Sequence, residues 1–420
     1  MKRIAFLLVA VAIVVGVHAL EFPEPTKCLN GRRSRERHLH NAHPTSFDWR
    51  LRMTPHFLSV QSAFRVALLL FAGLLWTRPA VAQTADAWTA RAKEGTFTAS
   101  HFLFNDGETL PSLHLHYRTL GSAHRGTDGH IDNAVLLLHG TGGSSKSFLI
   151  PTFADVLFGP GQPLDMHRYY LIFPDDIGHG ESSKPSDGLH MHFPHYDYDD
   201  MVRGQHLLVQ DGLHVDHLRL IFGTSMGCMH TFLWGVTYPG YTDALASFAC
   251  LTVPIAGRNQ MWRSMAMEAI RNDPAWLGGE YKSEPVAGLR AESSLFLIAT
   301  SSALQLQKRY PTRQQTQNYT DQYLGQSVHS IDANDCLYYL DASRSYDPSA
   351  QLGRITVPVL WVNSADDFIN PPDLGIAQQE ARRMPNARFV LLPLTPETHG
   401  HLTFNYAAVW QQYLAELLKR

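Results

Sequence analysis

Residues 220–230 read LIFGTSMGCMH and place a single serine between two glycines, at the point where an apolar, strand-like run ends. Side chains at Gly223 and Gly227 would not fit a tight strand-to-helix turn, and such a turn holds the Ser225 hydroxyl clear of the backbone. Ser225 is therefore a candidate nucleophile. Because a serine hydroxyl is weakly nucleophilic near neutral pH, it needs a histidine as base and a carboxylate that orients the histidine.

Two later stretches offer these partners, each of them twice. VPVLWVNSADDFINPP contains a strand pattern followed by Asp366 and Asp367. RFVLLPLTPETHGHLTF contains another strand pattern followed by His399 and His401. The chain order serine, acid, histidine is the one expected when the nucleophile lies in a strand–turn–helix motif. The residues alone leave both pairs open.

Acyl transfer through a serine also creates a negatively charged oxygen, which backbone N–H groups must stabilise. The first donor is expected to be the amide of Met226, directly after the nucleophile. The second is expected in the loop after an earlier strand, HGTGG at residues 139–143, where the amide of Thr141 is the best candidate. His139 is expected to have a structural role.

Buried strand patterns alternate with helical patterns along most of the chain. This rhythm predicts a mostly parallel sheet with helices on both faces. The expected strands are residues 113–118, 134–138, 169–173, 218–222, 245–253, 357–363 and 388–392, and the clearest helical patterns are 201–213 and 406–418.

Residues 255–345 interrupt this rhythm. They are rich in Met, Trp, Gln and Arg and have a helical pattern without a strong strand signal. We interpret them as a helical lid over one end of the sheet. The core is then expected in two parts, residues 83–254 and 346–420.

The first 82 residues are predicted to be a leader rather than part of the fold. Residues 1–19 combine a charged start, an apolar run and small residues, as secretory signals do, and a second such pattern follows Arg65 and ends in AVA. Since tandem signals make little physical sense, either translation begins at Met53 or a foreign leader was joined upstream. Each apolar run is about a dozen residues, short for a bilayer span. We expect a mature protein that begins at Gln83, has no stable membrane anchor and is periplasmic or secreted.

Composition excludes some classes of partner. The formal net charge is −3 and the second half has no long basic run, so nucleic acid is not an expected partner. Three cysteines remain after the leader: Cys228, Cys250 and Cys336. One bridge is possible in an exported protein, but the sequence does not assign it, and the default for Cys228 is a small packed thiol. No metal or cofactor is expected.

Several stretches resemble the homoserine O-acetyltransferase branch of the α/β-hydrolase superfamily. They are DDIGHGESSKPS, FPHYDYDDMVRGQHLL, GTSMGCMHTFLWGVTYP, IAGRNQMWRSMAMEAIRNDPAWLGGEY, NSADDFINPP and GHLTF, and the resemblance spans residues 95–418. It implies the α/β-hydrolase fold with a helical lid. It also selects Asp367, four residues before a proline, and His401, which follows a glycine, as the catalytic acid and base.

The chain departs from that branch in two places. Gly-Cys stands at positions 227 and 228, where the family usually has Gly-Gly. The lid stretch GLRAESSLFLIATSS has Glu292 and Ser293 near the place of the family's Ala-Arg, whose arginine holds the substrate carboxylate, and within this stretch only Arg290 is close. Arg258, Arg263 or Arg290 is expected as the substitute if the chain binds such a carboxylate.

These observations favour an exported serine esterase that cleaves small carboxylic esters through an acyl-serine intermediate. The alternative is an acyltransferase similar to homoserine O-acetyltransferase, with an acyl-CoA donor. A catalytically inactive binding protein on the same scaffold is a third reading, which the complete Ser-His-Asp set disfavours. The expected partner is a small-molecule ester, and a homodimer is possible.

Overall fold

The computed structural model describes residues 84–127 and 129–419, which belong to one compact unit. The predicted leader, with Met53 and the expected mature start at Gln83, lies outside the described residues. Within the described part of the chain, no helix is long and apolar enough to cross a membrane.

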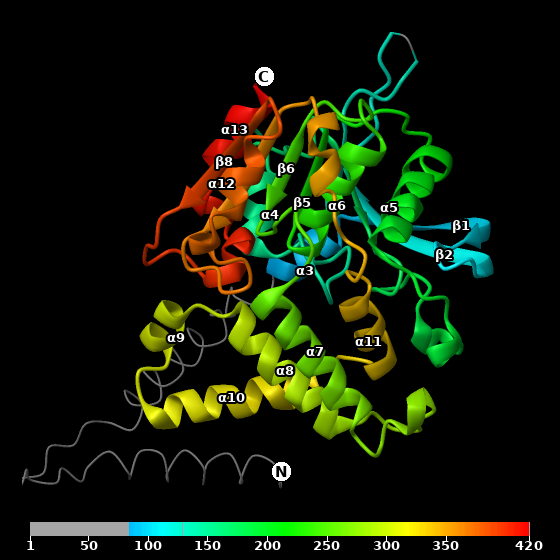
Figure 1. Cartoon of the computed structure of the whole chain (residues 1–420). Helices are drawn as coiled ribbons and strands as arrows, with labels where there is room; N and C mark the ends of the chain where they lie inside the picture. The colour runs from blue at the N-terminus through cyan, green and yellow to red at the C-terminus, as the bar shows by residue number, and fades with distance from the viewer. Residues whose placement is uncertain (1–83, 128, 420) are drawn as a thin grey trace, which may run out of the picture. The chain divides into compact units, whose positions relative to one another are not determined.

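An eight-stranded sheet in the order β1-β2-β4-β3-β5-β6-β7-β8 forms the centre of this unit (Figure 1). β2 pairs antiparallel with both β1 and β4, and all other neighbours are parallel. This is the mostly parallel sheet that the alternation of strand and helix patterns predicts. The strands are β1 Lys93–Leu103, β2 Thr109–Leu120, β3 Ala134–Leu138, β4 Tyr170–Pro174, β5 Leu220–Thr224, β6 Leu245–Phe248, β7 Val359–Ser364 and β8 Ala387–Leu392.

Helices cover both faces of the sheet, because side chains of each central strand alternate between two apolar clusters. On β3, Leu136 and Leu138 join one cluster and Val135 and Leu137 join the other. The first face is covered by α5 Tyr198–Leu207, α6 Met226–Thr237 and α12 Ile376–Ala381, and the second by α3 Thr84–Thr89, α4 Pro151–Leu157 and α13 Gln411–Leu418.

Five further helices, all within residues 257–341, form what we call the helical insertion. They have an apolar cluster of their own, in which Trp262, Ile270, Leu289 and Leu337 are buried. In Figure 1 they lie together beyond one end of the sheet. The helices are α7 Gly257–Arg271, α8 Val286–Thr300, α9 Ala303–Arg309, α10 Arg313–Ser327 and α11 Ala333–Asp341.

The strand predictions are confirmed for β2 to β8, although several strand ends differ, whereas the edge strand β1 is missed. β1 is not predicted because it is an edge strand with mostly exposed residues and no apolar run. The strand expected at 245–253 ends at Phe248, since Ala249 has a φ of 63° that a strand does not allow. The helix expected at 201–213 begins earlier, because Asp197 and Asp200 form a reciprocal capping box at its start.

Candidate active site

The turn at Ser225 connects β5 to α6 with strained backbone angles, φ 53° and ψ −112°. Glycine is required on both sides because the backbones approach closely. A Cβ on Gly223 would lie 2.1 Å from the Gly227 oxygen, and a Cβ on Gly227 would lie 2.0 Å from the Leu138 oxygen. The Ser225 amide donates to the oxygen of Phe248 at 2.8 Å, which ties the turn to β6.

Ser225, His401 and Asp367 form one hydrogen-bonded row. The Oγ of Ser225 lies 2.9 Å from Nε2 of His401, and Nδ1 of that histidine lies 3.0 and 3.1 Å from the two carboxylate oxygens of Asp367. An ionised carboxylate can only accept, so Nδ1 carries the proton and Nε2 is free to accept from the serine hydroxyl. Both His401 and Asp367 are buried, and they come from loops after β8 and β7.

The carboxylate of Asp367 is held by its own loop. Its Oδ1 accepts from the amides of Ile369 at 2.8 Å and Asn370 at 3.0 Å. The Asn370 side chain donates to the oxygen of Ala249 at 2.9 Å, while its own carbonyl accepts from Asn363 at 2.7 Å. Asn370 is a positioning residue that sequence reasoning missed. Its only signal is its place three residues after the acid, directly before Pro371.

The other two candidates, Asp366 and His399, lie outside the row. The Oδ2 of Asp366 accepts from the Ser302 hydroxyl at 3.0 Å and from the Gly400 amide at 2.8 Å, so this carboxylate links the helical insertion to the histidine loop. The ring of His399 stacks on Tyr406 with centroids 3.4 Å apart.

Thr141 and Met226, the predicted oxyanion donors, both lie beside Ser225. Met226 is the first residue of α6, where backbone N–H groups have no intrahelical acceptor. Thr141 lines the same small cavity as Ser225 and His401. The neighbouring Gly140 is so close that a Cβ there would lie 3.2 Å from the Cβ of Ser225.

His139 stabilises the loop at residues 139–143 by hydrogen bonds. Its Nε2 accepts from the amide of Asp176 at 3.2 Å, so the ring proton is on Nδ1, which donates to the Gly140 oxygen at 2.8 Å. The side chain of Asp176 is fully buried, and desolvation raises its pKa to about 6. These contacts give His139 the structural role that the sequence predicts.

The helical insertion closes the cavity that contains Ser225, which has a volume of about 60 Å³. Trp262, Arg263, Phe296 and Thr300 of the insertion line it. The guanidinium of Arg263 is buried, with Nε donating to Asn259 at 3.1 Å and Nη1 to the Leu340 oxygen at 3.2 Å.

Arg263 is a buried cation without a carboxylate partner among the residues that the structure describes. Arg290, the arginine nearest to the family's lid position, is half-exposed, pairs with Asp321 and does not line the cavity. Arg258 donates to the Phe368 oxygen at 2.6 Å and lies over the ring of that residue. Of these three arginines, Arg263 is the one that lines the cavity containing Ser225.

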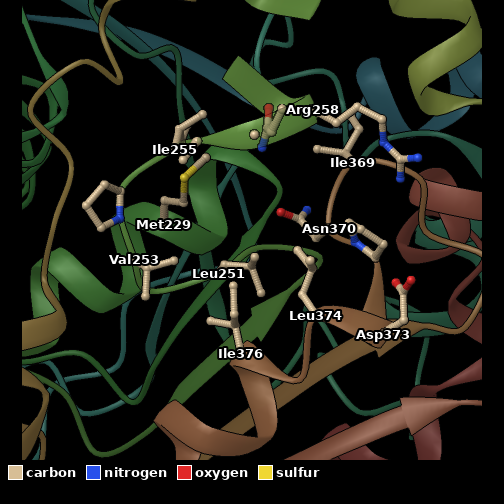
Figure 2. Close-up of a pocket in the computed structure, with 15 residues that line it drawn as sticks. Met229, Leu251, Val253, Ile255, Arg258, Ile369, Asn370, Asp373, Leu374 and Ile376 are labelled. Atoms are coloured by element: carbon tan, nitrogen blue, oxygen red, sulfur yellow. The ribbon is translucent and has the colours of Figure 1, made fainter. Parts of the chain in front are cut away.

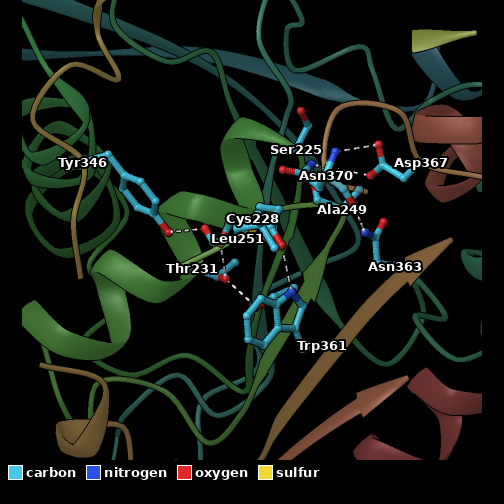
Figure 3. Close-up of a disulfide and its surroundings, with 12 residues drawn as sticks. Ser225, Cys228, Thr231, Ala249, Leu251, Tyr346, Trp361, Asn363, Asp367 and Asn370 are labelled. Carbon is cyan, nitrogen blue, oxygen red and sulfur yellow. Dashed lines mark hydrogen bonds between the residues drawn. A yellow bond between two sulfur atoms is a disulfide. The ribbon is translucent and has the colours of Figure 1, made fainter. Parts of the chain in front are cut away.

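A disulfide joins Cys228 in the first turn of α6 to Cys250 just after β6 (Figure 3). The expectation of a packed thiol at position 228 is therefore wrong. The two cysteines are 22 residues apart in sequence but 5.8 Å apart between Cα atoms, because β5 and β6 are neighbours. Cys336 is free and buried.

Comparison with known proteins agrees with this fold. A family model described as alpha/beta hydrolase fold matches residues 133–402. Homoserine O-acetyltransferase of Pelobacter propionicus is 31% identical over 306 residues, which cover 64% of this chain and 80% of that protein. The chain belongs to the α/β-hydrolase superfamily. Within it, the chain is a member of the homoserine O-acetyltransferase-like branch.

Solved structures of this superfamily share the fold but differ in the reaction that their titles name. Homoserine O-acetyltransferase from Bacillus anthracis has a TM-score of 0.69 at 21% identity and covers 78% of this chain and 98% of its own. An acetylester hydrolase from Corynebacterium glutamicum has the same TM-score at 22% identity and covers 80% and 98%. At these identities the likeness establishes the fold, and the reaction has to be argued from the site.

Proposed function

We propose that this chain is an acyl-serine enzyme in which Ser225 attacks an ester carbonyl. His401 takes the serine proton on Nε2, and Asp367 holds the ring in the required tautomer and stabilises the imidazolium that forms. The amides of Met226 and Thr141 donate to the oxyanion. His401 then protonates the leaving alcohol, which departs and leaves the acyl group on Ser225. The 2.9 Å contact between Ser225 and His401 carries this proposal.

We propose water as the acceptor in the second step, which makes the enzyme a carboxylic-ester hydrolase. The disulfide between Cys228 and Cys250 supports this choice, because disulfides persist in oxidising compartments outside the cytoplasm. An exported enzyme meets little acyl-CoA, whereas water is always available. Neither step requires a metal or a cofactor.

Acyl transfer to an amino-acid alcohol is the second candidate, and the sequence relatives favour it over hydrolysis. Those relatives are named as homoserine O-acetyl- and O-succinyltransferases. One observation in the site also favours it: Arg263 is a buried guanidinium beside Ser225 without a carboxylate partner in the described chain. The carboxylate of homoserine would neutralise it, because guanidinium binds carboxylate in a bidentate manner.

A direct competition separates the two reactions. The mature enzyme is given p-nitrophenyl acetate alone, and in a second assay acetyl-CoA with homoserine, while acetate, acetylhomoserine and free CoA are measured. Hydrolysis predicts acetate from the ester with little acetylhomoserine. Acetylhomoserine that forms faster than the ester is cleaved would establish the transferase instead. Ser225→Ala should abolish either reaction, by several orders of magnitude in kcat.

Arg263→Met, with Arg290→Met as its matched control, adds a second discriminating measurement. A transferase that uses Arg263 for the acceptor carboxylate loses homoserine acetylation in the first variant and keeps it in the second. A hydrolase of neutral esters shows no comparable difference in acceptor use, since water needs no guanidinium.

A further inference from the structure

A second cavity of about 500 Å³ lies beside the serine cavity, and it is mostly apolar (Figure 2). We call it the apolar cavity. Its walls come from the loop after β6, the first turn of α7 and the segment between Asp367 and α12. Side chains that face it include Leu251, Val253, Ile255, Leu374 and Ile376.

The apolar cavity adjoins the site of the proposed reaction. Met229, Asn259, Ile369 and Asn370 line both it and the cavity that contains Ser225. Met229 lies one turn of α6 after the serine, and its amide donates to the backbone carbonyl oxygen of Ser225 at 3.2 Å. A group bound in the apolar cavity would therefore extend from an ester whose carbonyl lies at Ser225.

The wall formed by the loop after β6 is held in place by the core. The oxygen of Cys250 accepts from the Trp361 indole at 3.1 Å, and that of Leu251 accepts from the Tyr346 hydroxyl at 2.9 Å. Figure 3 shows both contacts around the disulfide. Because these partners are buried, this wall exists before any ligand binds, which lowers the entropic cost of binding.

The charges around the apolar cavity indicate a neutral occupant. Arg258 and Asp373 are the charged residues among those that line it. The guanidinium of Arg258 lies 3.5 Å from the ring centre of Phe368 and donates to its backbone oxygen. Asp373 is exposed. Neither charge is enclosed among the apolar side chains, and a charged ligand group would lose its hydration there without a buried partner.

We propose that the apolar cavity binds a neutral alkyl or aryl group of the ester substrate, on either its acyl or its alcohol side. The inference rests on the proposed acyl-serine chemistry and narrows the substrate from small carboxylic esters to esters with one extended apolar group. A volume of about 500 Å³ is within the range of pockets that enclose small molecules.

Two substrate series distinguish the acyl side from the alcohol side. The first is p-nitrophenyl acetate, butyrate, hexanoate and octanoate. The second is ethyl, butyl and hexyl acetate, whose hydrolysis is measured by the acid that it releases. We expect kcat/KM to rise along one series, by up to about fourfold for each methylene that is buried. A flat or falling kcat/KM along both series overturns the proposal.

Two variants alter the cavity without touching the triad. Leu374→Trp fills it from an exposed position, and Ile376→Asp places a charge at the first residue of α12, where a helix tolerates an acid. In whichever series rises for the wild type, we expect each variant to lower the ratio of long-chain to short-chain kcat/KM at least tenfold. Leu103→Trp, at an exposed position at the end of β1, is the control and should keep the wild-type ratio.

The outcomes separate this inference from the proposed function. If Ser225→Ala hydrolyses these esters at the wild-type rate, the acyl-serine proposal fails. If hydrolysis depends on Ser225 but both cavity variants keep the wild-type ratio, the function stands and the apolar cavity does not bind substrate.

Discussion

At the scale of single residues, the nucleophile turn is the most constrained point of the site. A non-glycine residue at the φ of Ser225 costs on the order of 1–3 kcal/mol, so the surrounding structure has to impose this conformation. Gly223 and Gly227 permit it by close backbone approach, and the hydrogen bond from the Ser225 amide to the Phe248 carbonyl oxygen holds it. In this conformation the Ser225 hydroxyl contacts Nε2 of His401, and the proposed reaction depends on that contact.

The sequence offers two candidates for the catalytic acid and two for the base, so substituting all four tests which of each pair is catalytic. His401→Ala and Asp367→Asn should each lower kcat by roughly 10⁴-fold, because one removes the base and the other its orienting charge. His399→Ala and Asp366→Asn should lower it less than about tenfold, since these side chains stack on Tyr406 and bind Ser302 and Gly400. Steady-state kinetics on one ester measures all four. A reversed order within either pair would contradict the assignment.

At the scale of elements, α8 contains a carboxyl group near the position where the family resemblance implies an arginine. Glu292 is buried and accepts from the hydroxyl of Ser293 at 3.1 Å. Desolvation raises its pKa to about 7, from an ordinary value of 4.5. The helix therefore contributes a buried acid that is neutral below pH 7, in place of a substrate-binding cation.

This raised pKa predicts how stability depends on pH. Between pH 4.5 and 7 the folded state binds the Glu292 proton more tightly than the unfolded state does, so the free energy of unfolding falls as pH rises through this window. Glu292→Gln has no group that titrates at this position, so its free energy of unfolding should not show this fall with pH. The variant should be more stable than wild type at pH 8 by on the order of 2–3 kcal/mol, and nearly equal to it at pH 5. Urea unfolding at both pH values measures this.

The exposed Glu397 supplies the control for that experiment. Glu397→Gln should change the free energy of unfolding little at either pH. An equal effect of Glu292→Gln at pH 5 and pH 8 would show that the buried carboxyl does not titrate in this window.

At the scale of the whole molecule, the parallel sheet assembles the site from distant segments. The loops after β3, β5, β7 and β8 supply Thr141, Ser225, Asp367 and His401, because parallel strands bring their carboxyl ends to the same edge. At this edge the disulfide joins the first turn of α6 to the loop after β6. Its closed loop of 22 residues should stabilise the fold by about 3 kcal/mol.

Export and the disulfide can be tested together. Expressed from Met53 in a bacterium, the protein should be periplasmic and begin near Gln83, as the AVA motif predicts. It should then contain one free thiol under denaturing conditions, that of Cys336, since the other two mature cysteines are bonded. N-terminal sequencing and thiol titration check both points. Active, soluble protein that begins at Met1 or Met53, or three free thiols, would contradict the proposed location.

The sequence by itself determined the sheet, the nucleophile turn and the order of its partners, because each depends on a local pattern. Apolar runs, glycines around a serine, and acids or histidines just after strands are visible within short windows. The central strands and the position of Ser225 follow from such windows, and the family resemblance selects Asp367 and His401 from the doubled candidates.

Only the tertiary structure decided which distant side chains meet. The Cys228–Cys250 pair depends on the adjacency of β5 and β6, and the choice of Arg263 over Arg290 depends on how the helical insertion packs on the core. The apolar cavity is likewise formed by Met229 together with residues from the stretches 251–259 and 369–376, which are far apart in sequence. Sequence patterns do not reveal these features. Packing between elements decides which residues of a folded chain are close, and residues that meet in this way have no fixed spacing along the sequence.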